Sequence, residues 1–389
     1  MKKNGKQLLS LLLALVLLAT CCVTAAAEPL QFGSDGKFTI LHLTDTQDDQ
    51  YPARELKPFL QKAIETAKPD LIVFTGDLVE DTRWGDFKDD FGIWEGVKVL
   101  GSKDKTKANA TKAAEYVLQI LSDSGVPFAM VQGNNDYKVN VDNESWLALY
   151  DQYTGNLTSD MSTDAEGIDY RLPILGSDGS VKLNVYCMDS MENGVSTASL
   201  DWYTADSAAQ TAANGTVPAF VFQHIPVEEI SNFFVPCDKN DPNAVLVARE
   251  DGVNFFKLSD AAHGYFDTVY YSKTGKSDEF AAWKQQGDII AAFFGHMHQD
   301  GYSGIYDGIE LSLTYGCEFA KSGPYGMRVI TVDENDVASY DNQAYTYTDG
   351  TFTADTKDTP QKTFTEKIKL FIDSLLYIAK TLIKKVLPV

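Results

Sequence analysis

Residues 288–298 read DIIAAFFGHMH, and the rest of the chain is organised around this stretch. Its apolar centre has no polar face, which is typical of a strand buried on both sides of a sheet. His296 and His298 follow and alternate with Met297, so an extended chain directs both imidazoles to the same side. Neutral histidine is the commonest metal ligand, and the whole chain has 5 histidines. The pair is interpreted either as part of a metal site or as two solvated loop histidines.

The first 27 residues are predicted to be a secretory signal peptide. Lysines precede an apolar stretch over residues 8–19, and alanines at 25–27 supply small residues for cleavage. The apolar core is shorter than the ~20 residues that a membrane-spanning helix needs. Cys21 leaves N-terminal lipidation as an alternative. The sequence therefore predicts a secreted or extracytoplasmic protein, with attachment to the cell surface as a variant of that prediction.

The composition is that of a folded and strongly acidic protein. A hydrophobic content of 44% over 389 residues is enough to build a substantial core. The formal net charge of -22 repels polyanions at long range, so nucleic acid is not expected as a partner. Beyond the predicted signal peptide, Cys187, Cys237 and Cys317 are too few to form a disulfide framework. The sequence does not indicate an oligomeric state.

Apolar strands alternate with helices along the rest of the chain. Residues 38–44, 71–75 and 127–132 are predicted to be buried strands, with helices over residues 54–67 and 108–122 between them. This order predicts parallel strands that are joined by helical crossovers. Further strand-like runs lie at residues 182–188, 217–223, 309–314 and 327–332.

Five of the apolar strands end at polar side chains. These are carboxylates, amides and imidazoles, namely Asp45, Gln47, Asp77, Asn134, His224, His296 and His298. In α/β sheets, ligands bind at the carboxyl ends of the strands, so these residues are expected to converge in space. The mixed oxygen and nitrogen set suits divalent ions of the Mn, Fe, Zn or Mg type. Taken singly, each residue is more often a helix cap or a turn residue, but together they favour a common site.

These motifs, in this order, resemble those of the calcineurin-like metallophosphoesterases. The resemblance covers residues 38–332, and the context of His224 is similar to the fungal and plant branch grouped beside the purple acid phosphatases. It implies a four-layer α/β/β/α sandwich of two mixed β-sheets with flanking helices and a two-metal site at one rim. The implied ligands of the first metal are Asp45, Gln47, Asp77 and His298. Asp77 is shared with the second metal, which Asn134, His224 and His296 complete.

The resemblance implies hydrolysis of phosphate esters. Two cations ~3.5–4 Å apart clamp the phosphate oxygens and acidify a bridging water, and the resulting hydroxide attacks phosphorus. Asn135 occupies the position of the histidine thought to protonate the leaving oxygen, with Asp136 as its orienting partner. Because asparagine cannot titrate, esters with poor leaving groups are expected to react most slowly. The alternative is a catalytically weak or silent protein that keeps the metals and recognises a phosphorylated partner.

Gln47 is a second departure, since most members of the family have histidine there. An oxygen ligand in this position is expected to make the first site weaker for zinc and more tolerant of Mg or Mn. His263 is a further candidate for the missing proton donor, although the sequence gives no position for it.

The chain is predicted to have one catalytic domain and a C-terminal extension. The domain covers residues 28–350, with insertions near 84–107 and 228–286 that are expected to set specificity. Residues 351–365 are predicted to be a linker, and residues 366–389 a basic amphipathic helix. Peripheral contact with a membrane surface is one interpretation of this helix, and docking on its own domain is the other.

Overall fold

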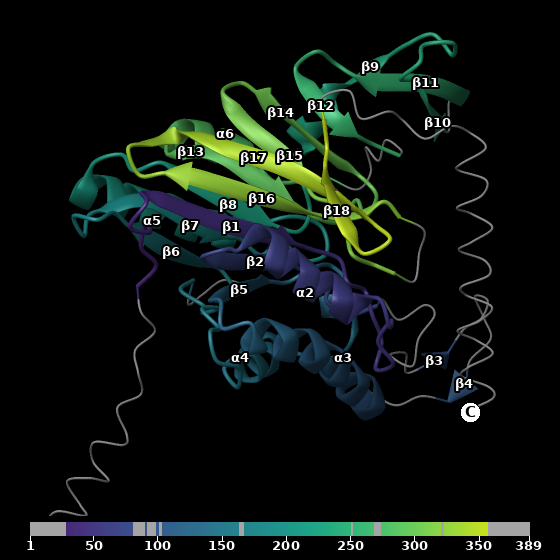
Figure 1. Ribbon diagram of the computed structural model, residues 1–389, viewed down its shortest axis with the longest axis horizontal. Coiled ribbons are helices and arrows are strands. Elements are labelled where there is room, and N and C mark those ends of the chain that lie inside the picture. The colour runs from purple at the N-terminus through teal and green to yellow at the C-terminus, as the bar shows by residue number, and fades with distance from the viewer. Residues whose placement is uncertain are drawn as a thin grey trace, which may run out of the picture.

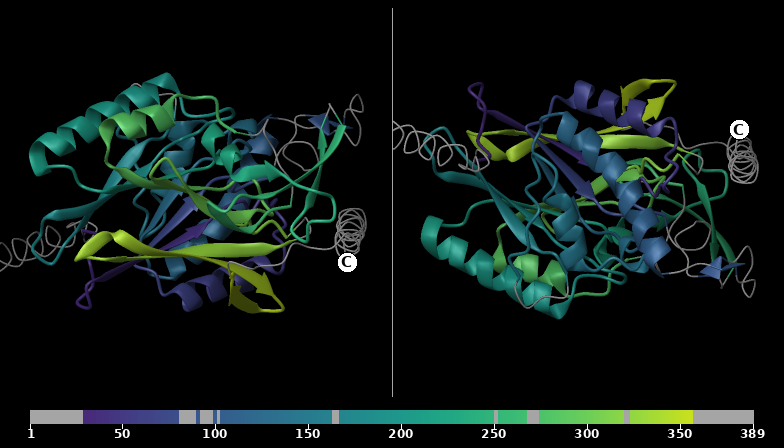
Figure 2. Two further views of the ribbon diagram at one scale, coloured as in Figure 1. Left: turned by 90° about the horizontal axis from the view of Figure 1, so that it is seen from above. Right: turned by 90° about the horizontal axis from the view of Figure 1, so that it is seen from below.

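A computed structural model describes residues 29–80, 90–91, 99–100, 103–162, 167–249, 252–267, 274–319 and 323–356 (Figure 1). Two large mixed β-sheets, of six and seven strands, form its centre. Helices lie on the outer faces of both sheets (Figure 2). This arrangement is the predicted four-layer α/β/β/α sandwich, so the predicted fold class is confirmed.

The six-stranded sheet contains the first strands of the chain and its last ones. In spatial order they are β18 (Thr351–Ala354), β17 (Asp336–Thr348), β16 (Tyr325–Asp333), β1 (Lys37–Leu43), β2 (Leu71–Thr75) and β5 (Phe128–Val131). β1, β2 and β5 are parallel, so their carboxyl ends meet at one rim of the sheet. All of β2 is buried, as its continuous apolar run predicts.

The seven-stranded sheet is built around the stretch quoted first. In spatial order its strands are β12 (Ala262–Tyr265), β14 (Gly301–Tyr306), β15 (Ile309–Leu313), β13 (Ile289–Phe294), β8 (Ala219–Gln223), β7 (Val181–Cys187) and β6 (Tyr170–Leu175). β13 lies between β8 and β15 and is parallel to both. Its carboxyl end, which leads into the two histidines, therefore lies beside the carboxyl end of β8.

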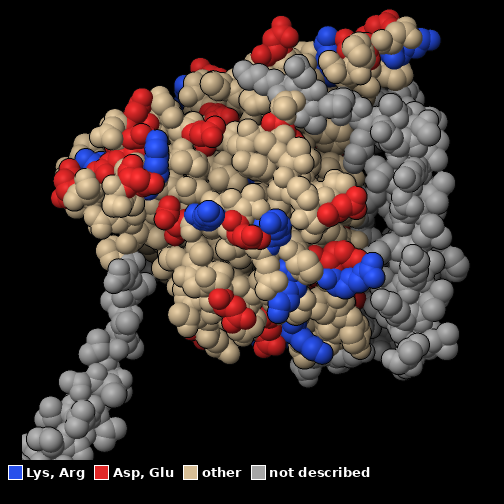
Figure 3. Space-filling model, in the orientation of Figure 1, with Lys and Arg blue, Asp and Glu red and all other residues tan. Residues whose placement is uncertain are grey.

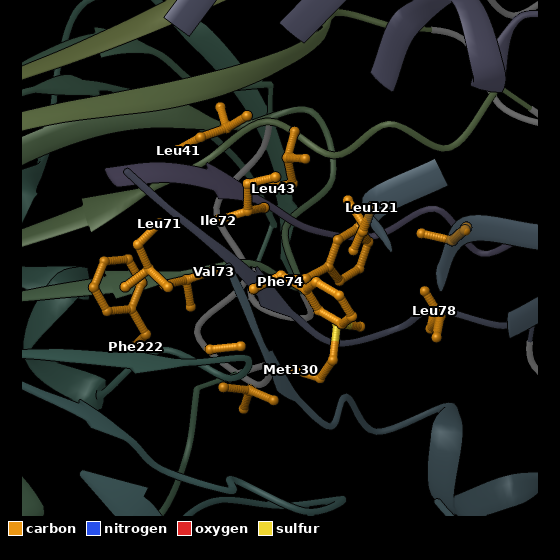
Figure 4. Close-up of a cluster of buried hydrophobic side chains, with 14 of the residues drawn as sticks. Leu41, Leu43, Leu71, Ile72, Val73, Phe74, Leu78, Leu121, Met130 and Phe222 are labelled. Atoms are coloured by element: carbon orange, nitrogen blue, oxygen red, sulfur yellow. The ribbon is translucent and has the colours of Figure 1, made fainter. Parts of the chain in front are cut away.

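Apolar side chains fill the space between the two sheets. Phe222 of β8 stacks on Phe293 of β13, with ring centroids 4.8 Å apart. In Figure 4, Phe222 lies beside Leu71 and Val73 of β2, which belong to the other sheet. Burial of these side chains holds the two sheets together and brings their rims side by side.

Five α-helices cover the sheets in the described part of the chain. They are α2 (Leu56–Ala67), α3 (Lys103–Asp123), α4 (Asn143–Tyr150), α5 (Thr197–Asn214) and α6 (Glu279–Gln286). α2 buries Leu56, Phe59, Leu60 and Ala63, which is the helical spacing that the sequence predicts. α2 and α3 agree with the predicted helices over 54–67 and 108–122, apart from their ends.

The domain boundaries differ from the prediction at two places. β18 pairs with β17 through Thr348 and Thr351, so residues 351–354 extend the sheet instead of starting a linker. In the described part of residues 228–286, β9 (Phe234–Pro236), β10 (Val245–Arg249) and β11 (Gly252–Leu258) form a separate sheet. β12 belongs to the central sheet, and its sequence AHGY contains no apolar run that would have predicted this strand.

Other predicted segments lie outside the described residues. These are the signal peptide over residues 1–27, most of the insertion near 84–107, and the C-terminal helix over residues 366–389. Within the described ranges, none of the helices is both long enough and apolar enough to span a membrane.

Candidate metal centre

The seven side chains predicted as metal ligands gather at the rim where the parallel strands end. Residues that follow β1, β2 and β5 come from one sheet, and residues that follow β8 and β13 come from the other. Asp77, His224 and His296 offer ligand atoms that all lie within 4.8 Å of one another. Asp45, Asp77 and His298 form a second such group. Asp77 belongs to both groups and therefore lies between them.

The contacts inside these groups join imidazole nitrogens to carboxylate oxygens and to each other. His224 Nε2 lies 3.4 Å from Asp77 Oδ1 and 3.2 Å from His296 Nδ1. His298 Nε2 lies 3.6 Å from Asp45 Oδ1. Asp45 Oδ1 is buried and has no hydrogen-bond partner, while Asp45 Oδ2 accepts from Thr44 Oγ1 and from the backbone N–H of His296. Carboxylate oxygens and imidazole nitrogens that face one another in this way are held together either by protons or by a shared cation.

Two of the imidazoles are held by groups outside the centre. His224 Nδ1 lies 2.7 Å from the carbonyl oxygen of Thr75, and His298 Nδ1 lies 2.5 Å from Glu318 Oε2. A carbonyl or a carboxylate accepts hydrogen bonds, so each Nδ1 carries a proton, and each Nε2 can present a lone pair to a cation that takes the place of a proton there. This is the usual arrangement of metal-binding histidines. The sequence did not indicate Glu318, because it lies in the connection between β15 and β16 without any motif.

The two predicted amide ligands are oriented differently. Asn134 presents Oδ1 to His224 Nε2 at 3.1 Å and to His296 Nδ1 at 2.8 Å, as a metal-binding oxygen would. The reversed amide would instead donate hydrogen bonds to both imidazoles, and it suits a centre without a cation. Gln47 presents Nε2 to Asp77 Oδ2 at 2.5 Å. A half-turn of this amide would present its oxygen, as the ligand role implied by the resemblance requires.

The backbone at this rim is strained. Of the ten described residues other than glycine with positive φ, five are predicted ligands, namely Asp45, Gln47, Asp77, His296 and His298, with φ between 38° and 71°. Such conformations cost of order 1–3 kcal/mol each and concentrate at functional sites. Gly133 allows the loops after β2 and β5 to approach closely, since a Cβ there would lie 2.1 Å from the backbone nitrogen of Asp77.

The electrostatics of the centre favour a cation. Burial alone would raise the pKa of Asp77, but the imidazole of His224 lowers it below its ordinary value. Burial raises the pKa of Asp45. Burial alone would lower the pKa of His224, but the carboxylates of Asp77 and Asp45 raise it to about 9. A divalent cation neutralises such carboxylates and replaces the proton on Nε2 of His224.

The two predicted catalytic residues lie beside the centre, but they do not pair with each other. Asn135 donates from its backbone N–H and from Nδ2 to the two oxygens of Asp77, both at 2.8 Å. Asp136 accepts from the backbone N–H groups of Gly133 at 2.8 Å and Val79 at 3.2 Å. Its carboxylate therefore ties the loop after β2 to the loop after β5, which differs from the predicted orienting contact with Asn135. Burial and the charge of Asp77 raise the pKa of Asp136 to about 7.

His263 lies away from these residues. It belongs to β12, where it pairs with Ser303 of β14. It lines a cavity of about 370 Å³ together with Arg328 and Asn342, and none of the seven predicted ligands lines that cavity. The structure therefore does not place His263 where it would replace the missing proton donor.

The chain is similar to known proteins over most of its length. The family model described as calcineurin-like phosphoesterase matches residues 38–300. "Probable inactive purple acid phosphatase 14" of Arabidopsis thaliana is 25% identical over 367 residues, which cover 82% of this chain and 80% of that protein. "Probable inactive purple acid phosphatase 29" of the same plant is 23% identical over 388 residues, covering 86% and 88%. A solved dimetal phosphatase from Danio rerio aligns at 14% identity with a TM-score of 0.46, covering 80% of this chain and 99% of that one.

Proposed function

Because the chain belongs to the calcineurin-like phosphoesterase family, we propose that it hydrolyses phosphate esters with the help of two divalent cations. The observation that carries the proposal is the position of Asp77 in both groups of converging ligand atoms. A carboxylate shared in this way suits two neighbouring cations. When bound, such cations supply an acidified water as nucleophile and clamp the phosphate oxygens.

The side chains of the chain itself would hold the cations as the resemblance implies. Asp45, Gln47, Asp77 and His298 would hold the first, and Asp77, Asn134, His224 and His296 the second. Hydrogen bonds to Asp45 Oδ2 from Thr44 and His296 leave Oδ1 as the ligand atom. The identity of the cations is proposed only as a class, Mn, Fe, Zn or Mg, because oxygen and nitrogen ligands suit all of them.

A second candidate function rests on Asn135. Its side chain donates to Asp77 and cannot release a proton to a leaving group. The two relatives from Arabidopsis thaliana are named as inactive phosphatases, which favours weak or absent turnover. The alternative is therefore a protein that holds the metals and binds a phosphorylated partner without hydrolysing it.

A substrate panel with metal analysis tests the proposal. The mature chain is purified with Mn²⁺ and is given aryl monoesters, alkyl monoesters and diesters. If the chain is a phosphoesterase, it should turn over the aryl esters. Asp77→Ala should lose both this turnover and the bound metal, and the surface control Asp123→Ala should keep the turnover. Bound metal without turnover of any ester would overturn hydrolysis and support the binding function. Absence of bound metal from the unaltered chain would overturn both.

We also propose export and contact with a membrane surface, which rest on the sequence alone. Export is tested by locating the mature protein after expression with and without residues 1–27. Membrane contact is tested by liposome binding at low and high salt, with and without residues 366–389. Equal binding by both forms would remove the membrane proposal.

A further inference from the structure

Lys138 places an ammonium group at the edge of the candidate metal centre. It ends the short helix η1 (Asp136–Lys138), and its Nζ donates to Asn135 Oδ1 at 3.2 Å. Asn135 donates in turn to both oxygens of Asp77. A single side chain therefore separates this ammonium group from the carboxylate that belongs to both ligand groups.

Within the described ranges, the charge of Lys138 has no counter-charge beside it. Other lysines such as Lys37, Lys182 and Lys257 each lie within 3.0 Å of a carboxylate oxygen. On the face of the molecule seen in Figure 3, basic side chains lie among acidic ones. Among the residues that the structure describes, no carboxylate lies within 4.0 Å of Lys138 Nζ, although acidic residues outnumber basic ones by 55 to 33. The partly buried ammonium group thus donates to the neutral amide of Asn135 and retains its attraction for an anion.

Binding of a cation would leave the ammonium group of Lys138 with fewer hydrogen-bond acceptors in the neighbouring amides. When Asn134 presents its oxygen to the imidazoles, its nitrogen donates to Asn135 Oδ1 and lies 3.0 Å from Lys138 Nζ. Two donor groups at that distance cannot form a hydrogen bond with each other. The remaining N–H groups of Lys138 must then find an acceptor outside this pair of amides. The anionic oxygens of a ligand bound at the centre are such acceptors.

We propose that Lys138 binds the phosphoryl group of the ligand and supplies there the positive charge that Asn135 cannot provide. The inference rests on the proposed function, since it concerns the same centre. A fixed ammonium group stabilises negative charge on a phosphoryl or leaving oxygen electrostatically, without any transfer of a proton. A phosphate monoester carries more negative charge than a diester, so Lys138 contributes more to the binding of monoesters.

Calorimetric binding of inorganic phosphate to the full mature chain loaded with Mn²⁺ tests this role. We expect Lys138→Ala to weaken phosphate binding about 10- to 100-fold, which is the range for loss of one charge-assisted hydrogen bond. Lys138→Arg should recover most of this loss, because a guanidinium group keeps the charge and binds phosphate oxygens. Lys182→Ala is the matched control and should bind phosphate as the unaltered chain does. The metal content of all four proteins is measured and should be equal.

The possible outcomes separate this inference from the proposed function. Unchanged phosphate affinity in Lys138→Ala overturns the inference, even if the protein hydrolyses esters. Loss of bound metal in Lys138→Ala also overturns it, because the lysine would then act by positioning Asn134 and Asn135. Weaker phosphate binding with normal metal content supports the inference, whether or not the unaltered chain shows turnover. Where turnover is present, its loss in Lys138→Ala should be larger for an aryl monoester than for a diester.

Discussion

Two buried polar clusters in this protein differ in the balance between hydrogen-bond donors and acceptors. The first is the candidate metal centre, and the second surrounds Arg328 of β16, which is 1% exposed. Arg328 donates from Nη1 to Asn342 Oδ1 at 2.8 Å and from Nη2 to the carbonyl oxygen of Leu313 at 2.6 Å. Asn342 Nδ2 donates further to Glu310 Oε1 at 2.7 Å. Each of these contacts joins a donor to an acceptor, so the Arg328 cluster is satisfied by the chain alone.

The metal centre lacks this balance. His224 Nε2 can donate to Asp77 Oδ1 only while the imidazole is protonated, and Asp45 Oδ1 is buried without a hydrogen-bond partner. Asp45, Asp77 and His224 are buried, whereas Glu310 and Asn342 are partly exposed, so an unpaired acceptor is more costly in the metal centre. The difference between them indicates which polar cluster is completed by a ligand and which one holds the sheets together.

His42 lies between the two clusters and contacts both. His42 Nδ1 lies 2.8 Å from Thr314 Oγ1, which Arg328 also contacts, and His42 Nε2 lies 2.7 Å from Thr75 Oγ1. The carbonyl of Thr75 holds His224. Burial and the charge of Arg328 lower the pKa of His42, so its imidazole stays neutral at pH 7. The contact that His42 makes between the Arg328 cluster and the metal centre therefore runs through uncharged groups.

The strongest test of the comparison removes one carboxylate from each cluster. Glu318→Gln replaces the acceptor of His298 Nδ1–H by a weaker one and should lower metal affinity about 10- to 100-fold, as loss of such supporting contacts usually does. Glu310→Gln is the matched control in the Arg328 cluster and should leave metal affinity unchanged. Titration of each apoprotein with Mn²⁺ gives the affinities. Equal losses in both variants would contradict the distinction between the clusters.

A smaller effect is expected from Gln47→His. An imidazole in place of the amide should favour Zn²⁺ over Mn²⁺ by about tenfold, or about 1.4 kcal/mol, because nitrogen is the better ligand for zinc. Competition between the two metals, followed by elemental analysis, measures this ratio. Gln50→His, three positions along the same loop, is the control and should not alter it. A ratio unchanged by Gln47→His would show that residue 47 is no ligand.

The sequence predicted the buried parallel strands and the site residues that follow them. Buried parallel strands are continuous apolar runs, and their carboxyl ends meet at one rim, so the residues after β13 could be assigned to a common site. Glu318 and Lys138 could not be found in this way, because each reaches the site through a loop or a short helix without periodicity. The strands β12 and β18 were missed for a related reason. Their residues are held by pairing with β14 and β17, and their own sequences have no strong strand pattern.

The smallest effect on metal binding is expected from Arg328→Met, although this variant should be clearly less stable. It leaves Leu313 O and Asn342 Oδ1 without their donors, and each unpaired buried acceptor costs about 1–3 kcal/mol. Thermal unfolding should therefore occur at a lower temperature in both the metal-free and the metal-loaded protein. The affinity for Mn²⁺ should stay unchanged at temperatures well below unfolding, because no predicted ligand contacts the guanidinium group. A tenfold weaker affinity would show instead that His42 transmits the state of the Arg328 cluster to His224, and the two clusters would then be one functional unit.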